Sequence, residues 1–253
     1  MIAAIPDSPV AVPAAVQGLV GAALATPVWR NELGGLTFRI GAADGRSRFL
    51  KWSPPGGPDL SAEIARLRWA APLWPVPPVL DHGADDDGAW LLTDGLPGAS
   101  AVDPRWVARP RAAVRAIGEA LRALHDALPV ADCPFGWALE DRRDRAHTAA
   151  AALGTSAADL ARLADAPDID RLVVCHGDAC APNTLIGDDG RFTGHVDLGT
   201  LGVADRWGDL AVATWSTEWN YGPGWDGELL AAYGIAPDAE RTAYYRLLWD
   251  CTP

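Results

Sequence analysis

The sequence predicts an α+β protein with a strand-rich N-terminal part and a mainly helical C-terminal part. Three short runs have the composition of β-strands, at residues 36–40, 48–52 and 89–93. Between residues 111 and 128, apolar side chains recur every three or four positions, which predicts an amphipathic helix. The breaker sequence Asp-Gly-Leu-Pro-Gly at 94–98 separates the two patterns. We therefore expect an N-terminal lobe over 1–93, a hinge over 94–98 and a C-terminal lobe over 99–253.

The remaining elements follow from local composition. The first 25 residues are rich in Ala, Val and Pro, and they predict either a strand and a short helix or a loose segment. The rest of the first lobe is expected to hold a turn at 43–45, a helix at 60–69 and a strand that opens at Val79. In the second lobe we expect helices within 140–170 and after Asp209, and strands at 172–175, 184–186 and 192–196. A Gly/Pro/Trp-rich stretch at 219–225 predicts a break before the last helical segment.

The chain is strongly acidic, with a net charge of −12. Nucleic acids and anionic membranes are bound through basic patches, so this charge argues against both as partners and is compatible with a cationic small molecule. The four cysteines form no CxxC pair and have no zinc-ligand spacing, which indicates free thiols in a reducing compartment. The N-terminus has neither the pattern of a signal peptide nor that of a membrane span, and we expect a cytoplasmic protein.

Lys51 is the only lysine among the 21 basic residues of the chain. A lysine offers a compact point charge, whereas an arginine offers a wide planar fork. Lys51 lies in the strand predicted at 48–52, and Glu63 lies on the helix that follows it. A chance surface lysine is the alternative interpretation, but this position favours a functional one.

The most informative segments are His-Gly-Asp-Ala-Cys-Ala-Pro-Asn at 176–183 and His-Val-Asp-Leu-Gly at 195–199. The first leaves a buried strand and enters an irregular loop, and the second follows a neighbouring strand. Two acids and an amide, Asp178, Asn183 and Asp197, then stand at the ends of neighbouring strands. Such an oxygen-rich set suits Mg²⁺ and phosphoryl transfer, which needs a metal, a cation on the phosphates and a carboxylate that orients a hydroxyl. Simple capping of turns is the alternative for any one of these residues.

Three sequence blocks, in order and with the expected gaps, resemble the aminoglycoside phosphotransferase family. They are H-G-D-x-x-x-x-N at 176–183, V-D-x-G at 196–199 and G-x-x-D-x-x-x-D-L-A at 202–211. The resemblance implies a protein-kinase-like two-lobed fold, with an antiparallel sheet in the N-terminal lobe and helices in the C-terminal lobe. It also implies a nucleoside triphosphate donor, ATP or GTP, together with Mg²⁺.

The resemblance assigns roles to individual residues of the C-terminal lobe. Asp178 would be the catalytic base or hydroxyl orienter, and Asn183 and Asp197 would hold the metal ions. His176 would support the loop, and Asp209 would lock the fold.

In the N-terminal lobe, the resemblance implies nucleotide contacts. Lys51, paired with Glu63, would hold the α- and β-phosphates. The glycines of the loop before residue 36 would cover the phosphates, and the backbone of the hinge would bind adenine. The residues concerned are Gly34, Gly35, Asp94 and Leu96.

On the acceptor side, the resemblance implies a cationic aminoglycoside and a role in antibiotic resistance. The acidic residues expected to bind this substrate are Glu218, Asp226 and Asp250. Where some family members have two adjacent acids, the chain has Trp219 and Asn220. The surrounding stretch is aromatic, and its rings either pack a loop or stack on an acceptor.

Three other functions stay open at this point. The same chemistry can act on another alcohol, such as a macrolide, a choline-like compound or an unidentified metabolite. A nucleotide-binding protein without catalysis is a second possibility. A metal-dependent hydrolase is a third, because two H-x-D pairs, at 176–178 and 195–197, could chelate a transition metal. The sequence does not decide between a monomer and a homodimer.

Overall fold

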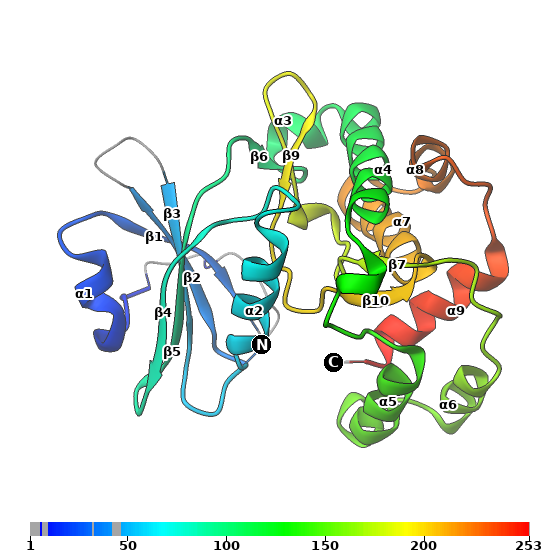
Figure 1. The fold of residues 1–253 in the computed structure, drawn as a ribbon, viewed down its shortest axis with the longest axis horizontal. Helices are drawn as coiled ribbons and strands as arrows, with labels where there is room; N and C mark the ends of the chain where they lie inside the picture. The colour runs from blue at the N-terminus through cyan, green and yellow to red at the C-terminus, as the bar shows by residue number, and fades with distance from the viewer. Residues whose placement is uncertain (1–5, 7–9, 32, 42–46, 253) are drawn as a thin grey trace. The chain divides into compact units, whose positions relative to one another are not determined.

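The computed structural model describes residues 6, 10–31, 33–41 and 47–252. The chain divides into two compact units, Met1–Leu96 and Pro97–Pro253 (Figure 1). The division falls inside segment 94–98, and the hinge role of that segment stays a prediction. The turn predicted at 43–45 lies outside the described residues. In the described part of the chain, no helix has the length and apolar character needed to cross a membrane.

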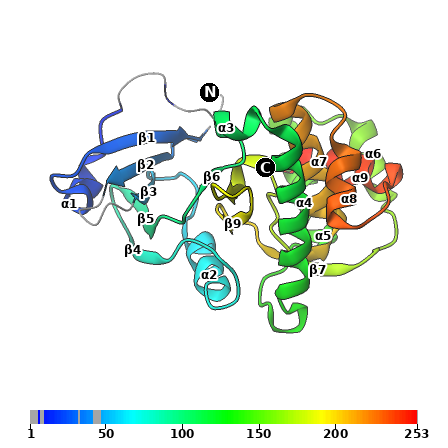
Figure 2. The ribbon, with the colours of Figure 1, turned by 90° about the horizontal axis from the view of Figure 1, so that it is seen from above.

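The first unit is built around a five-stranded antiparallel sheet with the strand order β1-β2-β3-β5-β4 (Figures 1 and 2). Its strands are β1 (Ala25–Arg30), β2 (Leu36–Gly41), β3 (Ser47–Ser53), β4 (Val79–Asp85) and β5 (Gly88–Asp94). Alternate side chains of a strand point to opposite faces of the sheet, and in β2 this places Leu36, Phe38 and Ile40 in the core. They pack with Val16 and Leu50.

Three short helical segments complete the first unit: η1 (Ala14–Val16), α1 (Gln17–Val20) and α2 (Ser61–Ala70). The strands predicted at 36–40, 48–52 and 89–93 and the helix at 60–69 are confirmed to within two residues. Strand β1 was not predicted as such. Pro27 interrupts its sequence pattern, and the pairing of β1 with β2 shifts register between Pro27 and Trp29. An edge strand tolerates this proline because one side of its backbone has no partner strand.

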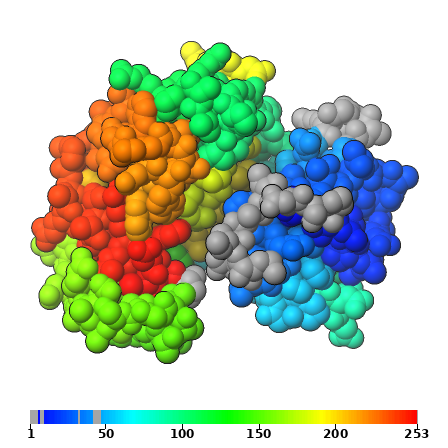
Figure 3. Space-filling view, turned by 180° about the vertical axis from the view of Figure 1, so that it is seen from behind, coloured from blue at the N-terminus to red at the C-terminus, as the bar shows by residue number. Residues whose placement is uncertain are grey.

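The second unit is mainly helical. Its helices are α3 (Pro104–Val107), α4 (Pro110–Ala127), η2 (Val130–Asp132), α5 (Leu139–Leu153), α6 (Ala157–Ala164), η3 (Ala181–Asn183), α7 (Trp207–Tyr221), α8 (Asp226–Tyr233) and α9 (Ala239–Asp250). The apolar stripe of α4 is buried, as its period predicts. Helix α7 contacts both α8 and α9, and the C-terminal helices form an orange-to-red area of the surface in Figure 3.

Two small antiparallel sheets carry the loops of the second unit. One joins β7 (Leu172–Cys175) to β10 (Gly202–Asp205), and the other has the order β6-β8-β9, with β6 (Ala99–Ser100), β8 (Thr184–Ile186) and β9 (Phe192–His195). The strands predicted at 172–175, 184–186 and 192–196 are confirmed. Strand β10 was not predicted, because only two residues separate it from the motif that ends at Gly199. Its pairing with β7 brings residues 176–178 close to the start of α7.

The break predicted at 219–225 begins too early. Helix α7 continues to Tyr221 and ends where Gly222 adopts a positive φ of 85°. Trp219 and Asn220 are therefore helical residues. The side chain of Asn220 donates to the Ser216 carbonyl oxygen at 2.7 Å, one helical turn earlier. Aromatic residues have only slightly lower helix propensity than the best helix formers, so the glycine and not the tryptophan ends the helix.

The buried carboxylate of Asp209 on α7 connects several segments of the second unit through hydrogen bonds. His125 of α4 donates from Nε2 to Asp209 Oδ2 at 3.0 Å, and its Nδ1 lies 2.9 Å from the hydroxyl of Tyr233 on α8. The backbone N–H groups of His176 and Gly177 donate to the same carboxylate at 2.6 and 2.9 Å. Three segments of the chain thus meet at one side chain that has no exposed surface, and α8 is joined to them through His125.

The charge of this carboxylate is stabilised by its donors. Burial by itself would raise the pKa of Asp209, but the hydrogen bond from His125, the nearby histidines and the Gly177 N–H outweigh burial and lower the pKa. A lowered pKa means that the ionised carboxylate stabilises the fold above its ordinary pKa of about 3.9. This contribution is lost as the pH falls through the lowered pKa.

We expect Asp209→Asn to lower the free energy of unfolding of the C-terminal unit by about 3–5 kcal/mol, because the new amide removes a buried charge that two N–H groups and a histidine satisfy. The matched control is Asp126→Asn, which removes an exposed carboxylate paired with Arg122. An exposed pair contributes about 1 kcal/mol or less. Urea unfolding followed by far-ultraviolet circular dichroism measures both variants, and equal losses would contradict the role of Asp209.

Candidate active site

The loop that follows β7 places Asp178 beside Asn183. Asn183, at the end of η3, donates from Nδ2 to the backbone oxygen of Asp178 at 2.9 Å and to its Oδ2 at 3.0 Å. The other carboxylate oxygen, Oδ1 of Asp178, is buried and has no hydrogen-bond partner among the described residues. Because a buried polar atom is normally satisfied, this oxygen lacks a donor, which the described residues do not supply.

The shape of this loop depends on the two residues before Asp178. Gly177 has a φ of 86°, and a Cβ atom at this position would collide with the backbone oxygen of Thr200. A side chain is therefore excluded here on both conformational and steric grounds. His176 donates from Nε2 to the Val196 carbonyl oxygen at 3.0 Å and accepts from the Asp178 N–H at Nδ1, at 3.3 Å. The expectation that His176 supports the loop is met by these bonds.

Asp197 lies two residues after the end of β9, in a backbone conformation that few residues adopt. Its φ is 61°, and it is the one non-glycine residue with a positive φ in the described part of the chain. Such a conformation costs of order 1–3 kcal/mol and is typical of functional sites. The neighbouring Val196 donates from its backbone to the Asn183 carbonyl oxygen at 3.0 Å, which keeps the start of the Asp197 turn next to Asn183.

The donor set of this loop fits a hard cation. Because Asn183 uses its amide nitrogen on two oxygens of Asp178, its carboxamide oxygen is directed away from that residue. A carboxamide oxygen and a carboxylate from neighbouring turns are ligands of the kind that Mg²⁺ takes, completed by water and phosphate oxygens. Asn183 and Asp197 are thus suited to the metal, although their roles as ligands stay a prediction.

The first unit contains the ion pair that the sequence predicts. Lys51 Nζ on β3 lies 2.7 Å from Glu63 Oε1 in the first turn of α2. The Glu63 side chain is 11% exposed and the Lys51 side chain is 25% exposed, so the pair is partly buried with an open side at the lysine. A lysine held in this way presents a fixed positive charge.

In the loop between β1 and β2, backbone N–H groups donate to Asn31 of the same loop. The Asn31 side chain accepts from the backbone N–H of Leu33 at 3.0 Å and of Gly35 at 2.7 Å, and the Asn31 carbonyl oxygen accepts from Gly34 at 3.2 Å. Gly34 has a φ of 86°. Phosphate contacts from Gly34 and Gly35 stay a prediction, and they would require Asn31 to release these donors. Asn31 was not singled out from the sequence, although an Asn before a Gly-Gly pair is typical of such a turn.

At the predicted adenine-binding segment, Asp94 is the last residue of β5. Its backbone N–H donates to the Pro78 carbonyl oxygen at 2.9 Å, so this donor is engaged inside the first unit. Leu96 follows as the last residue of that unit. Contacts of both residues with a base stay predictions.

The three acids predicted for the acceptor have different surroundings. Asp226 at the start of α8 accepts from Arg246 Nη2 at 3.0 Å, so its charge is compensated within the protein. Glu218 on α7 is exposed, and Asp250 ends α9. Burial raises the pKa of Asp250. The acceptor role of all three stays a prediction.

The geometry does not favour a transition-metal hydrolase. Both ring nitrogens of His176 are engaged with backbone groups, so the first H-x-D pair cannot chelate through its histidine. In the described part of the chain, one group of three side chains could in principle hold a metal, namely His125, Cys175 and Asp209. The histidine and the carboxylate of this group are hydrogen bonded, and burial raises the pKa of the Cys175 thiol. These three side chains therefore have a structural role in the core of the second unit.

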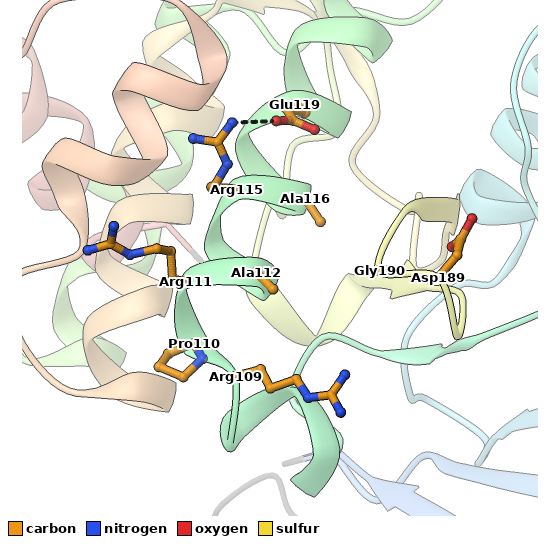
Figure 4. Close-up of a pocket in the computed structure, with 9 residues that line it drawn as sticks. All are labelled: Arg109, Pro110, Arg111, Ala112, Arg115, Ala116, Glu119, Asp189 and Gly190. Atoms are coloured by element: carbon orange, nitrogen blue, oxygen red, sulfur yellow. Dashed lines mark hydrogen bonds and ion pairs between the residues drawn. The ribbon is translucent and has the colours of Figure 1, made fainter.

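A groove on the second unit is separate from these residues. It has a volume of about 650 Å³ and lies between the first turns of α4 and the β8–β9 hairpin (Figure 4). Its lining consists of Arg109, Pro110, Arg111, Ala112, Arg115, Ala116, Glu119, Asp189 and Gly190. The guanidinium groups of Arg109 and Arg111 point in different directions, and Arg115 is paired with Glu119. The groove therefore has no converging charges and contains none of the predicted site residues.

A sheet unit that carries a Lys–Glu pair and a helical unit that carries an Asp/Asn loop together define a protein-kinase-like phosphoryl-transferring protein. A family model described as the phosphotransferase enzyme family matches residues 30–245 of the chain. The chain belongs to this family.

Individual relatives agree with this assignment. An aminoglycoside 3'-phosphotransferase from Streptomyces fradiae is 40% identical over 219 residues, covering 75% of this chain and 78% of the relative. A streptomycin 3''-kinase from Streptomyces griseus is 36% identical over 247 residues, covering 86% and 88%. The structure of aminoglycoside phosphotransferase APH(3'')-Id from Streptomyces rimosus, in complex with ADP and streptomycin, matches 94% of this chain and 96% of its own with a TM-score of 0.76 and 31% identity.

We expect Lys51→Ala to raise the KM for the nucleotide by roughly tenfold or more, because it removes the fixed charge next to Glu63. Arg48→Ala is the matched control, since Arg48 is an exposed cation on the same strand. Steady-state kinetics with varied nucleotide and saturating acceptor measures both. An unchanged nucleotide KM in the Lys51 variant would show that this lysine does not bind the donor.

Proposed function

We propose that the chain transfers the γ-phosphoryl group of ATP or GTP to a hydroxyl of an aminoglycoside, and that this modification confers resistance to the antibiotic. The family assignment supports phosphoryl transfer. The relatives from Streptomyces fradiae and Streptomyces griseus support an aminoglycoside as the acceptor, since both are enzymes that phosphorylate aminoglycosides by name. The acidic charge of the chain is compatible with a cationic acceptor.

The observation that carries this proposal is the bond from Asn183 to Asp178. It fixes the Asp178 carboxylate so that Oδ2 is satisfied and Oδ1 has no partner among the described residues. It also turns the Asn183 oxygen away from Asp178. One side chain can then orient an acceptor hydroxyl while its neighbour supplies a metal ligand.

The chemical step follows from this arrangement. The acceptor hydroxyl donates its hydrogen bond to Asp178 Oδ1, and its oxygen attacks the γ-phosphorus of the nucleotide. The bond from the γ-phosphorus to the bridging oxygen breaks, the nucleoside diphosphate leaves, and Asp178 takes up the hydroxyl proton. Phosphoryl transfer depends mainly on positioning and charge, so a carboxylate held this rigidly is sufficient for the orienting role.

The remaining groups bind the donor. Lys51, held by Glu63, is suited to the α- and β-phosphates in the first unit. Asn183 and Asp197 are suited to Mg²⁺, which when bound would neutralise charge on the phosphate oxygens. A nucleotide complex of a relative, the APH(3'')-Id structure with ADP, supports the use of a nucleotide.

We expect Asp178→Asn to lower kcat for acceptor phosphorylation by about 100-fold or more, because an amide cannot take up the hydroxyl proton. Nucleotide binding should change little, since the variant keeps an acceptor oxygen for Asn183. The matched control is Asp188→Asn, at an exposed carboxylate of the β8–β9 hairpin. Coupled nucleotide turnover with Mg²⁺ and an aminoglycoside measures kcat, and calorimetric titration measures nucleotide binding.

Two results would contradict the proposal. Wild-type rates in the Asp178 variant would remove Asp178 from the reaction. Tight nucleotide binding by the unmodified protein, without turnover of any aminoglycoside, would leave the kinase fold in place and direct the search to another acceptor alcohol.

A further inference from the structure

Three tryptophans of the second unit form a contiguous indole cluster. Trp215 and Trp219 lie one turn apart on α7, and Trp249 lies in the last turn of α9. The ring centroids are 5.0 Å apart for Trp215 and Trp219, 5.7 Å for Trp219 and Trp249, and 6.3 Å for Trp215 and Trp249. Every ring therefore contacts both of the others. Trp219 is 50% exposed, so the cluster also has a face toward solvent.

Arg246 of α9 contacts the cluster at Trp215. Its guanidinium group lies over the Trp215 ring, 5.6 Å from the ring centroid. The same group donates to Thr214 Oγ1 at 3.0 Å and to Asp226 Oδ2 at 3.0 Å. These bonds connect α9 to α7 and to the start of α8. Arg246 thus holds the Trp215 ring, and the rings of Trp219 and Trp249 pack against it.

Ser216 lies on the same helix as Trp215 and Trp219 and connects α7 to the loop that carries Asp178. Ser216 Oγ accepts from the backbone N–H of Ala181 at 2.9 Å, and Asn220 donates to the Ser216 carbonyl oxygen. Trp219 follows Ser216 by three residues on α7, so the two side chains are neighbours on the helix surface. The exposed indole is therefore about one helical turn from the contact between α7 and the loop that carries Asp178.

The acidic side chains near the cluster carry little uncompensated charge. Asp226 is paired with Arg246, and Glu228 on α8 is paired with Arg115. Among the described residues, the two acids predicted for the acceptor that have no arginine partner of this kind are Glu218, next to Trp219, and Asp250, next to Trp249. A polyamine bound mainly by charge would need more carboxylates than these two.

Resting on the function proposed above, we propose that Trp215, Trp219 and Trp249 form the surface that determines acceptor specificity, by stacking against the C–H face of a sugar or aminocyclitol ring. The ring faces of sugars carry polarised C–H groups, which match the negative face of an indole. Glu218 and Asp250 then receive an amino or guanidinium group at the edge of that ring. The preferred acceptor is one with few cationic groups, and its binding depends more on stacking than on charge.

The experiment compares the wild-type protein with Trp219→Ala and Trp219→Phe. The matched control is Trp29→Ala, which removes an indole that is 43% exposed on β1 of the other unit. The acceptors are streptomycin, hygromycin B and the polyamine neomycin. Acceptor KM, nucleotide KM and kcat are measured with Mg²⁺ and ATP, at salt concentrations from about 0.1 M to about 1 M, over which the Debye length falls from about 10 Å to about 3 Å.

We expect Trp219→Ala to raise the acceptor KM by roughly tenfold, with the nucleotide KM unchanged, and Trp219→Phe to restore most of the loss because it keeps an aromatic face. Trp29→Ala should leave all constants unchanged. The wild-type acceptor KM should change by less than about fivefold across the salt range, because a stacking contact is screened little. Among the three acceptors, neomycin should have the highest KM.

Different outcomes contradict different parts of the account. An unchanged acceptor KM in Trp219→Ala, or a steep salt dependence with neomycin preferred, would refute the stacking surface and leave the proposed function intact. If Trp219→Ala instead alters the oligomeric state in light scattering without a change in acceptor KM, the cluster is a contact between copies of the chain and the proposal is wrong. If the wild type binds nucleotide and phosphorylates none of the acceptors, the proposed function fails and this inference fails with it.

Discussion

The geometry of the loop that carries Asp178 depends on one buried carboxylate. The Asp209 carboxylate accepts hydrogen bonds from the backbone N–H groups of His176 and Gly177 and from the His125 ring. Without an acceptor at this point, two buried N–H groups would lose their partner, and the loop would have no fixed connection to α7. The conformational restriction of Gly177 then determines the direction in which the chain enters Asp178. The chemistry of the site is thus a consequence of packing in the helical unit.

Further hydrogen bonds connect the loop that carries Asp178 to the neighbouring segments of the second unit. Asn183 fixes the Asp178 carboxylate, Val196 connects Asn183 to the turn at Asp197, and Ser216 connects the loop to α7. Each of these contacts lies within the second unit, so Asp178, the metal-ligand candidates and the indole cluster share one framework. The first unit contributes an independent framework, in which β3 and α2 hold Lys51 against Glu63.

Much of this organisation could be predicted from the sequence, since it is encoded locally. The motif spacing indicated Asp178, Asn183 and Asp197 together, and helical periodicity located α4. The bonds that join distant segments could not be predicted, because no local pattern states which N–H an Asp will accept. The contact between Ser216 and Ala181 is of this kind. The indole cluster was also missed as a unit, since Trp249 lies thirty residues beyond Trp219 and the stretch at 219–225 suggested a break where α7 in fact continues.

The most direct test of the central claim is the identity of the product. The purified protein is incubated with Mg²⁺, ATP or GTP and streptomycin or a 2-deoxystreptamine aminoglycoside, and the acceptor is analysed by mass spectrometry and phosphorus NMR. The account predicts an acceptor that has gained one phosphoryl group on a hydroxyl oxygen, with one nucleoside diphosphate released per product. Nucleotide hydrolysis that releases inorganic phosphate and leaves every acceptor unmodified would contradict it.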